Sequence, residues 1–207
     1  MQAEIDLQTL TMAQEFHGHK CPAMPQGLRA GRLALELLGV EKAQGGELVA
    51  IVETGDHHFS GCFADGVMFA TGCTMGKGNI VKKPLGKFAL TLVDRQSGRA
   101  VRISAKACRM MQCLDMEFFR LRAGGLPPQK LDPAMVEPLI EDVLTRDPSE
   151  MFDVQMFEQY PLEAHKEDFT AVVCDGCGEL VVQSYAHKIG DKAYCGACLD
   201  AMLHCGA

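Results

Sequence analysis

The sequence has no long hydrophobic run and no excess of positive charge. None of its apolar stretches approaches the roughly 20 consecutive residues that a membrane-spanning helix needs, and its start, MQAEIDLQTL, lacks the basic-then-apolar pattern of a signal peptide. We therefore expect a cytoplasmic protein with no membrane partner. The formal net charge of −7 argues against a nucleic-acid partner, because binding through backbone phosphates needs clustered lysines and arginines.

Internal repeats and low-complexity segments are also missing, and the chain of 207 residues is long enough for one main domain plus a small appendage. The character of the sequence changes between residues 160 and 171, where the polar stretch YPLEAHKEDF contains a proline. We expect one domain over residues 1–165 and a second over residues 166–207.

Hydrophobic periodicity predicts a mixture of helices and strands in the first domain. Helical patterns cover residues 5–16, 25–38, 60–73 and 106–121, and a further helix begins at Asp132-Pro133. Strand patterns cover residues 47–54, 87–94 and 100–104, and Ser97-Gly98 would turn the second of these strands back into the third. Because no regular βαβ repeat is present, we predict an α+β fold with an antiparallel or mixed sheet and packed helices.

Four cysteines near the C-terminus have the spacing of a structural zinc site. The pairs are Cys174-x2-Cys177 and Cys195-x2-Cys198, and small residues in each pair permit a tight turn around a metal, as in a zinc ribbon or treble clef. The surrounding stretch has too few apolar residues to fold alone, so zinc would supply the missing free energy. The alternative is two pairs of buried free thiols. Disulfides are disfavoured in a reducing cytoplasm.

A second candidate metal site begins with three alternating residues: His17, His19 and Cys21. On an extended segment these side chains project to the same side, and Cys62 could supply a fourth ligand. Asp65, one helical turn after Cys62, could be a ligand, a base beside the metal or a catalytic residue. We expect a transition metal here, with zinc favoured. The equal alternative is that the histidines interact with a helix C-terminus and that Cys21 is a small packed residue.

Two adjacent histidines, His57 and His58, precede Cys62 and strengthen the metal interpretation, although at most one should face the same site. The glycine-rich stretch TGCTMGKGN, residues 71–79, lacks the spacing of a nucleotide-binding loop. Its exposed amides could still hold a small anion or cofactor together with Cys73 and Lys77. The alternative for this stretch is a purely structural turn.

Four segments follow one another along the chain: FHGHKCP, the CFAD of residues 62–65, TGCTMGKGNI and the four-cysteine module. In this order they resemble the FmdE family, which is named after one component of formylmethanofuran dehydrogenase. The resemblance implies a metal-binding α+β domain, a small zinc domain and a homodimer. It also implies association with the molybdenum or tungsten enzyme that reduces carbon dioxide onto methanofuran. The motif residues of the family fall on His17, His19, Cys21, Cys62, Asp65, Cys73, Gly76 and Lys77. Two departures are the second proline in CPAMP and the histidine-rich DHHFSGC.

Three functions are consistent with these features. The preferred one is an accessory protein or subunit of such an oxidoreductase, with a transition metal in the first domain. The second is a stand-alone zinc enzyme that acts on a small ligand, with Asp65, His57 or His58 as base. The third is a zinc-finger adaptor for protein or nucleic acid, and the few lysines between the cysteine pairs give little support for nucleic acid.

Overall fold

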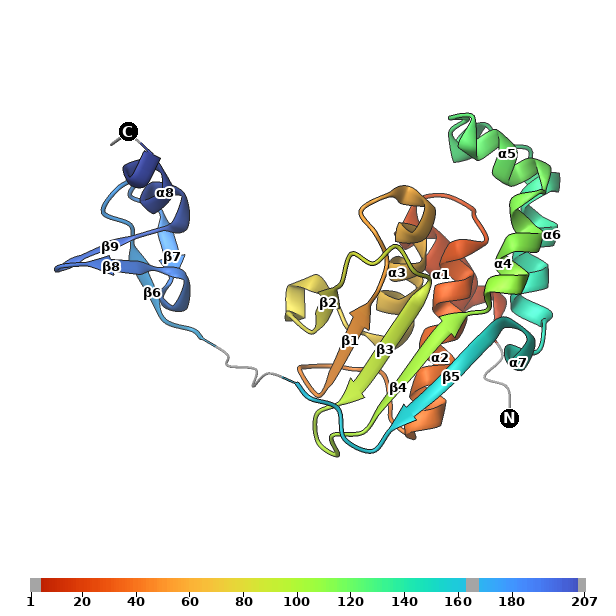
Figure 1. Cartoon of the computed structure of the whole chain (residues 1–207), viewed down its shortest axis with the longest axis horizontal. Coiled ribbons are helices and arrows are strands. Elements are labelled where there is room, and N and C mark those ends of the chain that lie inside the picture. Colours follow the sequence, from red (N-terminus) through yellow and green to blue (C-terminus); the bar gives the residue numbers. More distant parts are fainter. Residues whose placement is uncertain (1–4, 163–167, 205–207) are drawn as a thin grey trace. The chain divides into compact units, whose positions relative to one another are not determined.

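The structure is a computed structural model that describes residues 5–162 and 168–204. The chain divides into two compact units, Met1–Pro161 and Leu162–Ala207 (Figure 1). The domain boundary that we expected between residues 165 and 166 lies outside the described residues. Within the described residues, no helix has both the length and the apolar character needed to cross a membrane.

The first unit is built on a five-stranded sheet with the strand order β2-β1-β3-β4-β5. Its strands are β1 (Leu48–Val52), β2 (Ile80–Lys82), β3 (Ala89–Asp94), β4 (Ala100–Ala105) and β5 (Phe152–Phe157). The β1 strand pairs in parallel with β2 and antiparallel with β3, and the remaining pairs are antiparallel. The mixed sheet confirms the predicted fold class.

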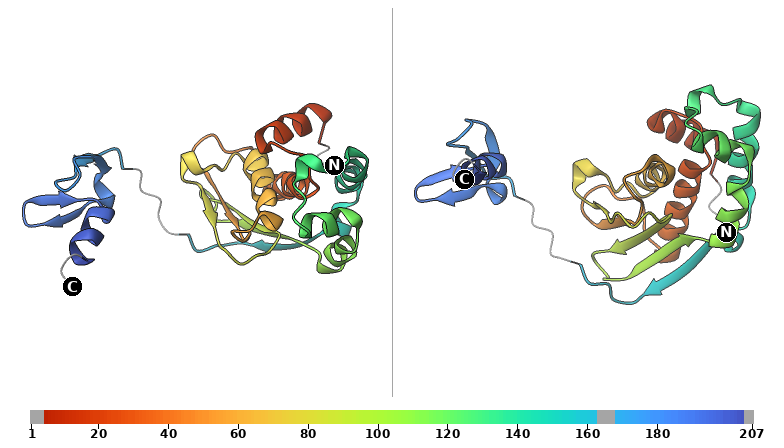
Figure 2. Two further views of the ribbon diagram at one scale, coloured as in Figure 1. Left: turned by 90° about the horizontal axis from the view of Figure 1, so that it is seen from above. Right: turned by 45° about the horizontal axis from the view of Figure 1, so that its top comes forward.

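Three helices pack against this sheet or against each other: α1 (Leu7–His17), α2 (Ala23–Leu38) and α3 (His58–Thr71). The two central ones, α2 and α3, lie together on one face of the sheet (Figure 2). Buried side chains of β1, β3 and β4 form the core beneath them, including Leu48, Val52, Leu90, Leu92, Val101 and Ile103. Alternation of side chains along the strands gives this face its apolar character.

Glycines bring α2 and α3 into backbone contact. A Cβ atom at Gly27 would lie 1.9 Å from the carbonyl oxygen of Phe63, and one at Gly66 would lie 2.0 Å from that of Met24. No other residue type fits either position without moving a helix. This close crossing fixes the start of α2, just after Cys21, relative to the first turns of α3, where Cys62 lies.

A second group of helices follows β4: α4 (Ala107–Leu114), α5 (Glu117–Ala123), α6 (Pro133–Thr145) and α7 (Pro148–Met151). Here the single helix that we predicted over residues 106–121 is wrong, because the chain is extended at Met116 and starts again as α5. The apolar residues that we expected along one face of this helix are divided: Met111 is 63% exposed, whereas Phe118 is buried. By contrast α6 begins as predicted, with the Asp132 side chain capping the amide of Ala134.

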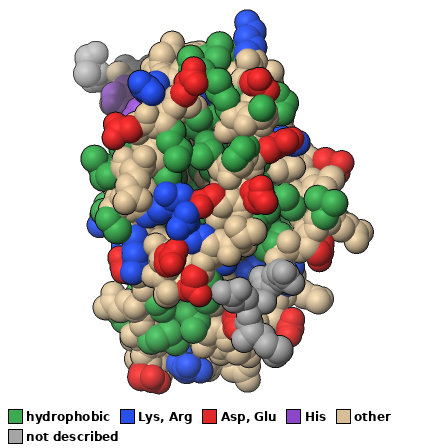
Figure 3. All heavy atoms as spheres, turned by 90° about the vertical axis from the view of Figure 1, so that its right-hand side faces the viewer, with side chains coloured by type: hydrophobic (Ala, Val, Ile, Leu, Met, Phe, Trp, Pro, Cys, Tyr) green, Lys and Arg blue, Asp and Glu red, His purple; other side chains and the backbone are tan. Residues whose placement is uncertain are grey.

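The α4–α6 group is attached to α2 and forms a second core with the first three helices. Arg29 of α2 donates hydrogen bonds to the carbonyl oxygens of Val143 and Arg146 at the end of α6. The second core includes Leu10, Ala13, Cys21, Met24, Leu28, Cys62, Phe118, Val136 and Ile140. Figure 3 shows the α4–α7 side of this unit, where acidic and basic side chains are interspersed among apolar ones.

The second unit consists of two hairpins and a terminal helix. Its elements are β6 (Ala171–Val173), β7 (Leu180–Val182), the 3-10 helix η3 (Gln183–Tyr185), β8 (His187–Ile189), β9 (Lys192–Tyr194) and α8 (Gly196–His204). Two further 3-10 helices, η1 (Met75–Lys77) and η2 (Pro128–Lys130), lie in the first unit. Among its described residues, Cys174 alone is buried. Small strands around a four-cysteine cluster fit the zinc-ribbon type that the sequence predicted.

Candidate functional site

Two structural features bring His17 and His19 to the same place. His17 is the last residue of α1, and Gly18 ends that helix in the left-handed conformation, with φ of 87°. The rings of His17 and His19 then lie 4.1 Å apart between their centroids. The extended segment that we expected here is wrong, because a helix end and a glycine turn, rather than strand alternation, make the side chains converge.

The ligand atoms of His17, His19, Cys21 and Cys62 all lie within 4.8 Å of one another. The Nε2 atom of His17 lies 3.6 Å from the sulfur of Cys21, and that of His19 lies 3.8 Å from the sulfur of Cys62. Ligands of a tetrahedral zinc ion would be separated by about 3.6 Å for a nitrogen and a sulfur, given the usual Zn–N and Zn–S bond lengths. The donor set and its spacing therefore fit a transition metal.

Asp65 is hydrogen-bonded to the His17 ring at the nitrogen that does not face the cluster. The Nδ1–H group of His17 donates to the Asp65 carboxylate over 2.7 Å, which leaves Nε2 directed at the cluster. Carboxylates commonly orient metal-binding histidines in this way. Burial of His17 disfavours its charged form, but Asp65 and Cys21 outweigh this and raise the pKa of His17 to about 9. A bound metal would displace the proton on Nε2 while Nδ1–H stays on Asp65.

The two thiols of this cluster differ in acidity. A hydrogen bond from Cys62 lowers the pKa of Cys21, and the two histidines and the Met24 amide at the start of α2 act in the same direction. The same contact with Cys21, together with burial, raises the pKa of Cys62. Both side chains are buried, with 6% exposed. The cluster thus favours a thiolate at Cys21, and a bound metal would displace the proton of the Cys62 thiol as well as that on Nε2 of His17.

His58 lies beside the cluster, and its neighbour His57 does not. The His58 ring is 5.2 Å from that of His19, while His57 is the N-cap residue that precedes α3. Partial burial, followed by the charge of Arg122, lowers the pKa of His58 below its ordinary value. This agrees with our expectation that at most one of the pair faces the site.

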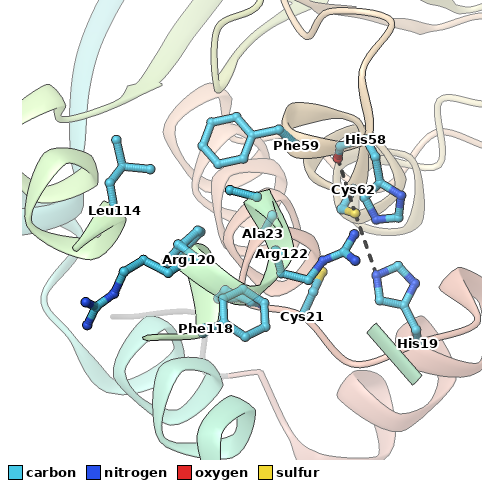
Figure 4. A pocket seen from close by; sticks show the side chains of 13 residues that line it. His19, Cys21, Ala23, His58, Phe59, Cys62, Leu114, Phe118, Arg120 and Arg122 are labelled. Atoms are coloured by element: carbon cyan, nitrogen blue, oxygen red, sulfur yellow. Dashed lines mark hydrogen bonds between the residues drawn. The ribbon is translucent and has the colours of Figure 1, made fainter. Parts of the chain in front are cut away.

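A cavity of about 550 Å³ opens beside the cluster (Figure 4). Three of the four cluster residues line it: His19, Cys21 and Cys62. Its opposite wall comes from α5 and includes Phe118, Phe119, Arg120 and Arg122. No pattern in the sequence indicated these α5 residues, because their place next to Cys62 depends on how α4–α6 pack on α2.

The two residues that we considered for an anion or cofactor, Cys73 and Lys77, have structural surroundings. Cys73 is fully buried in the core beneath α2 and α3, where burial raises its pKa. The Lys77 ammonium group donates a hydrogen bond to the carbonyl oxygen of Ala43 over 2.9 Å. These contacts favour the structural-turn interpretation of residues 71–79, and anion binding there stays a prediction.

The four cysteines of the second unit also converge, with sulfur atoms within 4.8 Å of one another. The sulfurs of Cys177 and Cys195 are 3.9 Å apart, close to the separation of about 3.8 Å that tetrahedral zinc imposes on two thiolates. A Cβ atom at Gly176 would lie 2.8 Å from the sulfur of Cys198, so the first turn needs glycine.

Backbone amides stabilise a thiolate in this cluster as well. The amides of Cys195 and Cys177 lower the pKa of Cys174 to about 6, and the neighbouring sulfurs raise the pKa of Cys198 to about 12. Amide-to-sulfur hydrogen bonds of this kind, such as that from Cys195 to Cys174 at 3.2 Å, are made to metal-bound thiolates. The arrangement fits a closed structural zinc site.

Comparison with known proteins identifies the family of the first unit. The family described as FmdE, Molybdenum formylmethanofuran dehydrogenase operon, matches residues 16–153, which is more than half of the chain. The chain belongs to the FmdE family. The match includes all four residues of the N-terminal cluster and the α5 wall of the cavity, and it confirms the family resemblance found in the sequence.

Two individual proteins extend the comparison. A protein of Archaeoglobus fulgidus named "Probable S-adenosyl-L-methionine-binding protein" is 33% identical over 187 residues, which is 84% of this chain and 48% of that protein. The chain thus spans about half the length of this curated relative. A tungsten formylmethanofuran dehydrogenase FmdE-like protein from Syntrophus aciditrophicus has the same fold, with a TM-score of 0.57 and 22% identity over 94% of this chain and 91% of that one.

Proposed function

We propose that this FmdE-family protein binds a transition metal, with zinc favoured, through His17, His19, Cys21 and Cys62. A second zinc ion would hold the C-terminal unit together through Cys174, Cys177, Cys195 and Cys198. One observation carries the proposal: two nitrogen and two sulfur donors from separate segments meet at tetrahedral spacing in a largely buried place. Asp65 then acts through His17, whose ring it orients.

Metal analysis of the full chain tests this proposal. Protein purified without chelators should carry two zinc ions per chain, and Cys21→Ala or Cys62→Ala should reduce this to one. Cys108→Ala is the matched control, because Cys108 is exposed on α4 and belongs to neither cluster. A single zinc ion that is retained in Cys21→Ala and Cys62→Ala would contradict the N-terminal site.

We further propose that the protein works as an accessory protein or subunit of a molybdenum or tungsten formylmethanofuran dehydrogenase-type oxidoreductase, as a homodimer in the cytoplasm. The family description, which names the operon of the molybdenum enzyme, supports this association. Mixing the purified chain with the purified dehydrogenase and following both by size-exclusion chromatography with light scattering tests it. Co-elution and a dimeric mass for the free chain are expected, and separate elution would contradict the association.

A second function, a stand-alone zinc enzyme, is favoured by a different observation. His19, Cys21 and Cys62 line a cavity large enough for a small organic molecule, so a metal held by them would lie at its edge. This function requires one coordination position that exchanges with the cavity. In cobalt-substituted protein the visible spectrum should then change on addition of azide. An unchanged spectrum would contradict the enzyme function and leave the accessory role as the proposal.

Titration with S-adenosylmethionine tests whether the name of the curated relative applies to this chain.

The adaptor function has less support from the second unit. Its described surface carries apolar side chains such as Phe169 and Leu180, which are 92% and 76% exposed, rather than a basic patch. A protein partner therefore suits it better than nucleic acid. A mobility-shift assay at low salt should show no tight nucleic-acid binding.

A further inference from the structure

The cavity beside the N-terminal cluster combines an aromatic wall with a cationic one. Phe59, Phe118 and Phe119 form a connected group of rings, with edge-on contacts of 6.3 Å between Phe59 and Phe119 and 4.9 Å between Phe118 and Phe119. Aromatic side chains in this arrangement provide flat apolar surface. At about 550 Å³ the cavity is within the range of pockets that hold small organic molecules.

The side chains that line the cavity, all of which are described, include two arginines of α5, Arg120 and Arg122, and no carboxylate. A bound divalent metal would balance the negative charge of the cluster thiolates. The Arg122 guanidinium is held in place by a hydrogen bond from Nη1 to the carbonyl oxygen of Leu126. A guanidinium group carries five N–H donors, so donors beyond this one bond remain for a ligand.

The two arginines differ in direction. In Figure 4 the guanidinium of Arg122 is directed toward His58 and Cys62, at the metal-binding side of the cavity, whereas that of Arg120 is directed away from them. Asp65, the acidic residue that supports the cluster, bonds to His17, which is not part of the cavity lining. An anionic group in the cavity would therefore meet Arg122 without an opposing carboxylate among the lining residues.

We infer that this cavity binds a small organic anion with a flat apolar body, with its carboxylate or phosphate against Arg122 and its ring system among Phe59, Phe118 and Phe119. The inference goes beyond the proposed function and rests on it only for the metal at the edge of the cavity. Arginine pairs with both carboxylate and phosphate through parallel hydrogen bonds, so either group satisfies it. The apolar wall selects ligands that carry a ring over small inorganic anions.

Calorimetric titration of the zinc-loaded full chain with three probes of similar shape tests the inference. The probes are 2-naphthoate, 2-naphthyl phosphate and the neutral 2-naphthamide. One or both anions should bind about 10- to 100-fold more tightly than the amide, the range that a charge-assisted hydrogen bond supplies. The stronger of the two anions identifies the group that the cavity takes.

Variants of α5 assign the effect to Arg122. Arg122→Gln should reduce the affinity for the anions to that for the amide, and Arg122→Lys should restore part of the difference because it keeps the charge. Arg120→Gln is the matched control, because Arg120 lies on the same helix and lines the same cavity but is directed away. It should change the anion affinity by less than about threefold, as expected of an exposed, screened charge.

Several outcomes would overturn the inference: equal affinity for anions and amide in the unsubstituted chain, no binding of any probe, or equal losses in Arg120→Gln and Arg122→Gln. Zinc content measured on the same samples separates this inference from the proposed function. Two zinc ions per chain without anion binding would refute the cavity ligand alone. Anion binding that depends on Arg122 in a chain with one zinc ion would refute the N-terminal metal alone.

Discussion

The two clusters of metal-ligating side chains differ in what surrounds them. The N-terminal cluster lies in a unit that has two apolar cores of its own, and its two cysteines are part of one of them. In the C-terminal unit, Cys174 alone is buried among the described residues, and large apolar side chains such as Leu180 and Phe169 are exposed. The fold of the first unit therefore positions its cluster, whereas the cluster of the second unit has to maintain the fold.

This difference separates the two proposed sites, because the first suits a functional metal and the second a structural one. Because the first unit has apolar cores of its own, we expect it to keep its fold without the proposed metal, and the coordination of that metal could then change during function. The second unit has no apolar core among its described residues that could replace the metal. The substitutions below test this contrast, beginning with the largest expected effect.

Replacement of one of the four cysteines of the second unit, here called the tail, should unfold that unit and leave the first unit intact. In Cys195→Ser, the loss of the zinc site removes a binding free energy of about 10–16 kcal/mol, the range for structural zinc in small domains. Amide signals of residues 168–204 should collapse to random-coil positions in a two-dimensional NMR spectrum, while those of residues 5–162 keep their positions. Cys108→Ser is the control. Dispersed tail signals in Cys195→Ser would show that the tail folds without its metal.

Overpacking at the α2–α3 crossing should destabilise the first unit without any change in ligands. In Gly66→Ala the new methyl group would lie 2.0 Å from the Met24 carbonyl oxygen and 2.5 Å from the Leu28 amide nitrogen, so the helices must separate. We expect a loss of about 3 kcal/mol in the free energy of unfolding, at the upper end for overpacking, measured by urea denaturation and circular dichroism.

The control for this substitution lies on the same helix. A Cβ atom at Gly61 meets nothing within 4 Å, so Gly61→Ala should stabilise α3 by about 0.5–1 kcal/mol through its helix propensity. Equal stabilities of the two variants would contradict the close crossing.

Loss of the carboxylate behind His17 should weaken the N-terminal metal site alone. Asp65→Asn removes the charged acceptor that orients the ring, and such changes reduce metal affinity by about 10- to 100-fold. Competition with a chromophoric chelator measures this for each site.

The tail offers the matched comparison, Glu179→Gln. Glu179 accepts from the Cys177 thiol at 3.7 Å, a contact that is lost when the thiolate binds metal, so less than about threefold change is expected at either site. An Asp65→Asn protein with unchanged N-terminal affinity would show that Asp65 has no role in the site.

A smaller effect concerns acid stability of the first unit. Arg102 donates two hydrogen bonds to Glu53 and thereby lowers the pKa of Glu53 below its ordinary value of 4.5. A lowered pKa in the folded state stabilises the protein above pH 4.5, and this stabilisation is lost as the pH falls through the folded-state value. Urea denaturation from about pH 7 to about pH 3 should show a steeper decline for the unsubstituted chain than for Glu53→Gln.

An exposed ion pair provides the control for this pH dependence. Asp56 bonds to Lys82, but its side chain is 78% exposed, so solvent screens the pair. Asp56→Asn should leave the pH profile of the first unit close to that of the unsubstituted chain. If Glu53→Gln and Asp56→Asn behave alike, the buried ion pair makes no special contribution.

Much of the fold could be predicted from the sequence because its longer elements carry clear apolar patterns. The first three helices, strands β1, β3 and β4, and the start of α6 lie within a few residues of their predicted positions. Two edge strands were not predicted. One of them, β2, has only three residues, and β5 is mostly exposed, so neither has a strong apolar pattern. The break at Met116 depends on tertiary packing, since nearby residues favour a helix.

The candidate site was predicted in part, and for a partly wrong reason. Ligand chemistry pointed to His17, His19, Cys21 and Cys62, and the structure brings these side chains together, while metal binding itself stays a prediction. Alternation along an extended segment was the wrong geometry, because a helix end and Gly18 arrange the histidines. The cavity wall could not be predicted, since the position of Arg122 depends on the long-range attachment of α4–α6 to α2.

A crystal structure of the protein purified without chelators, with diffraction recorded above and below the zinc absorption edge, tests the contrast between the two sites most directly. We expect two anomalous peaks per chain, one bonded to His17, His19, Cys21 and Cys62 and one bonded to the four tail cysteines. A peak at the tail alone, with the N-terminal side chains in contact only with one another, would contradict a metal function for the first unit.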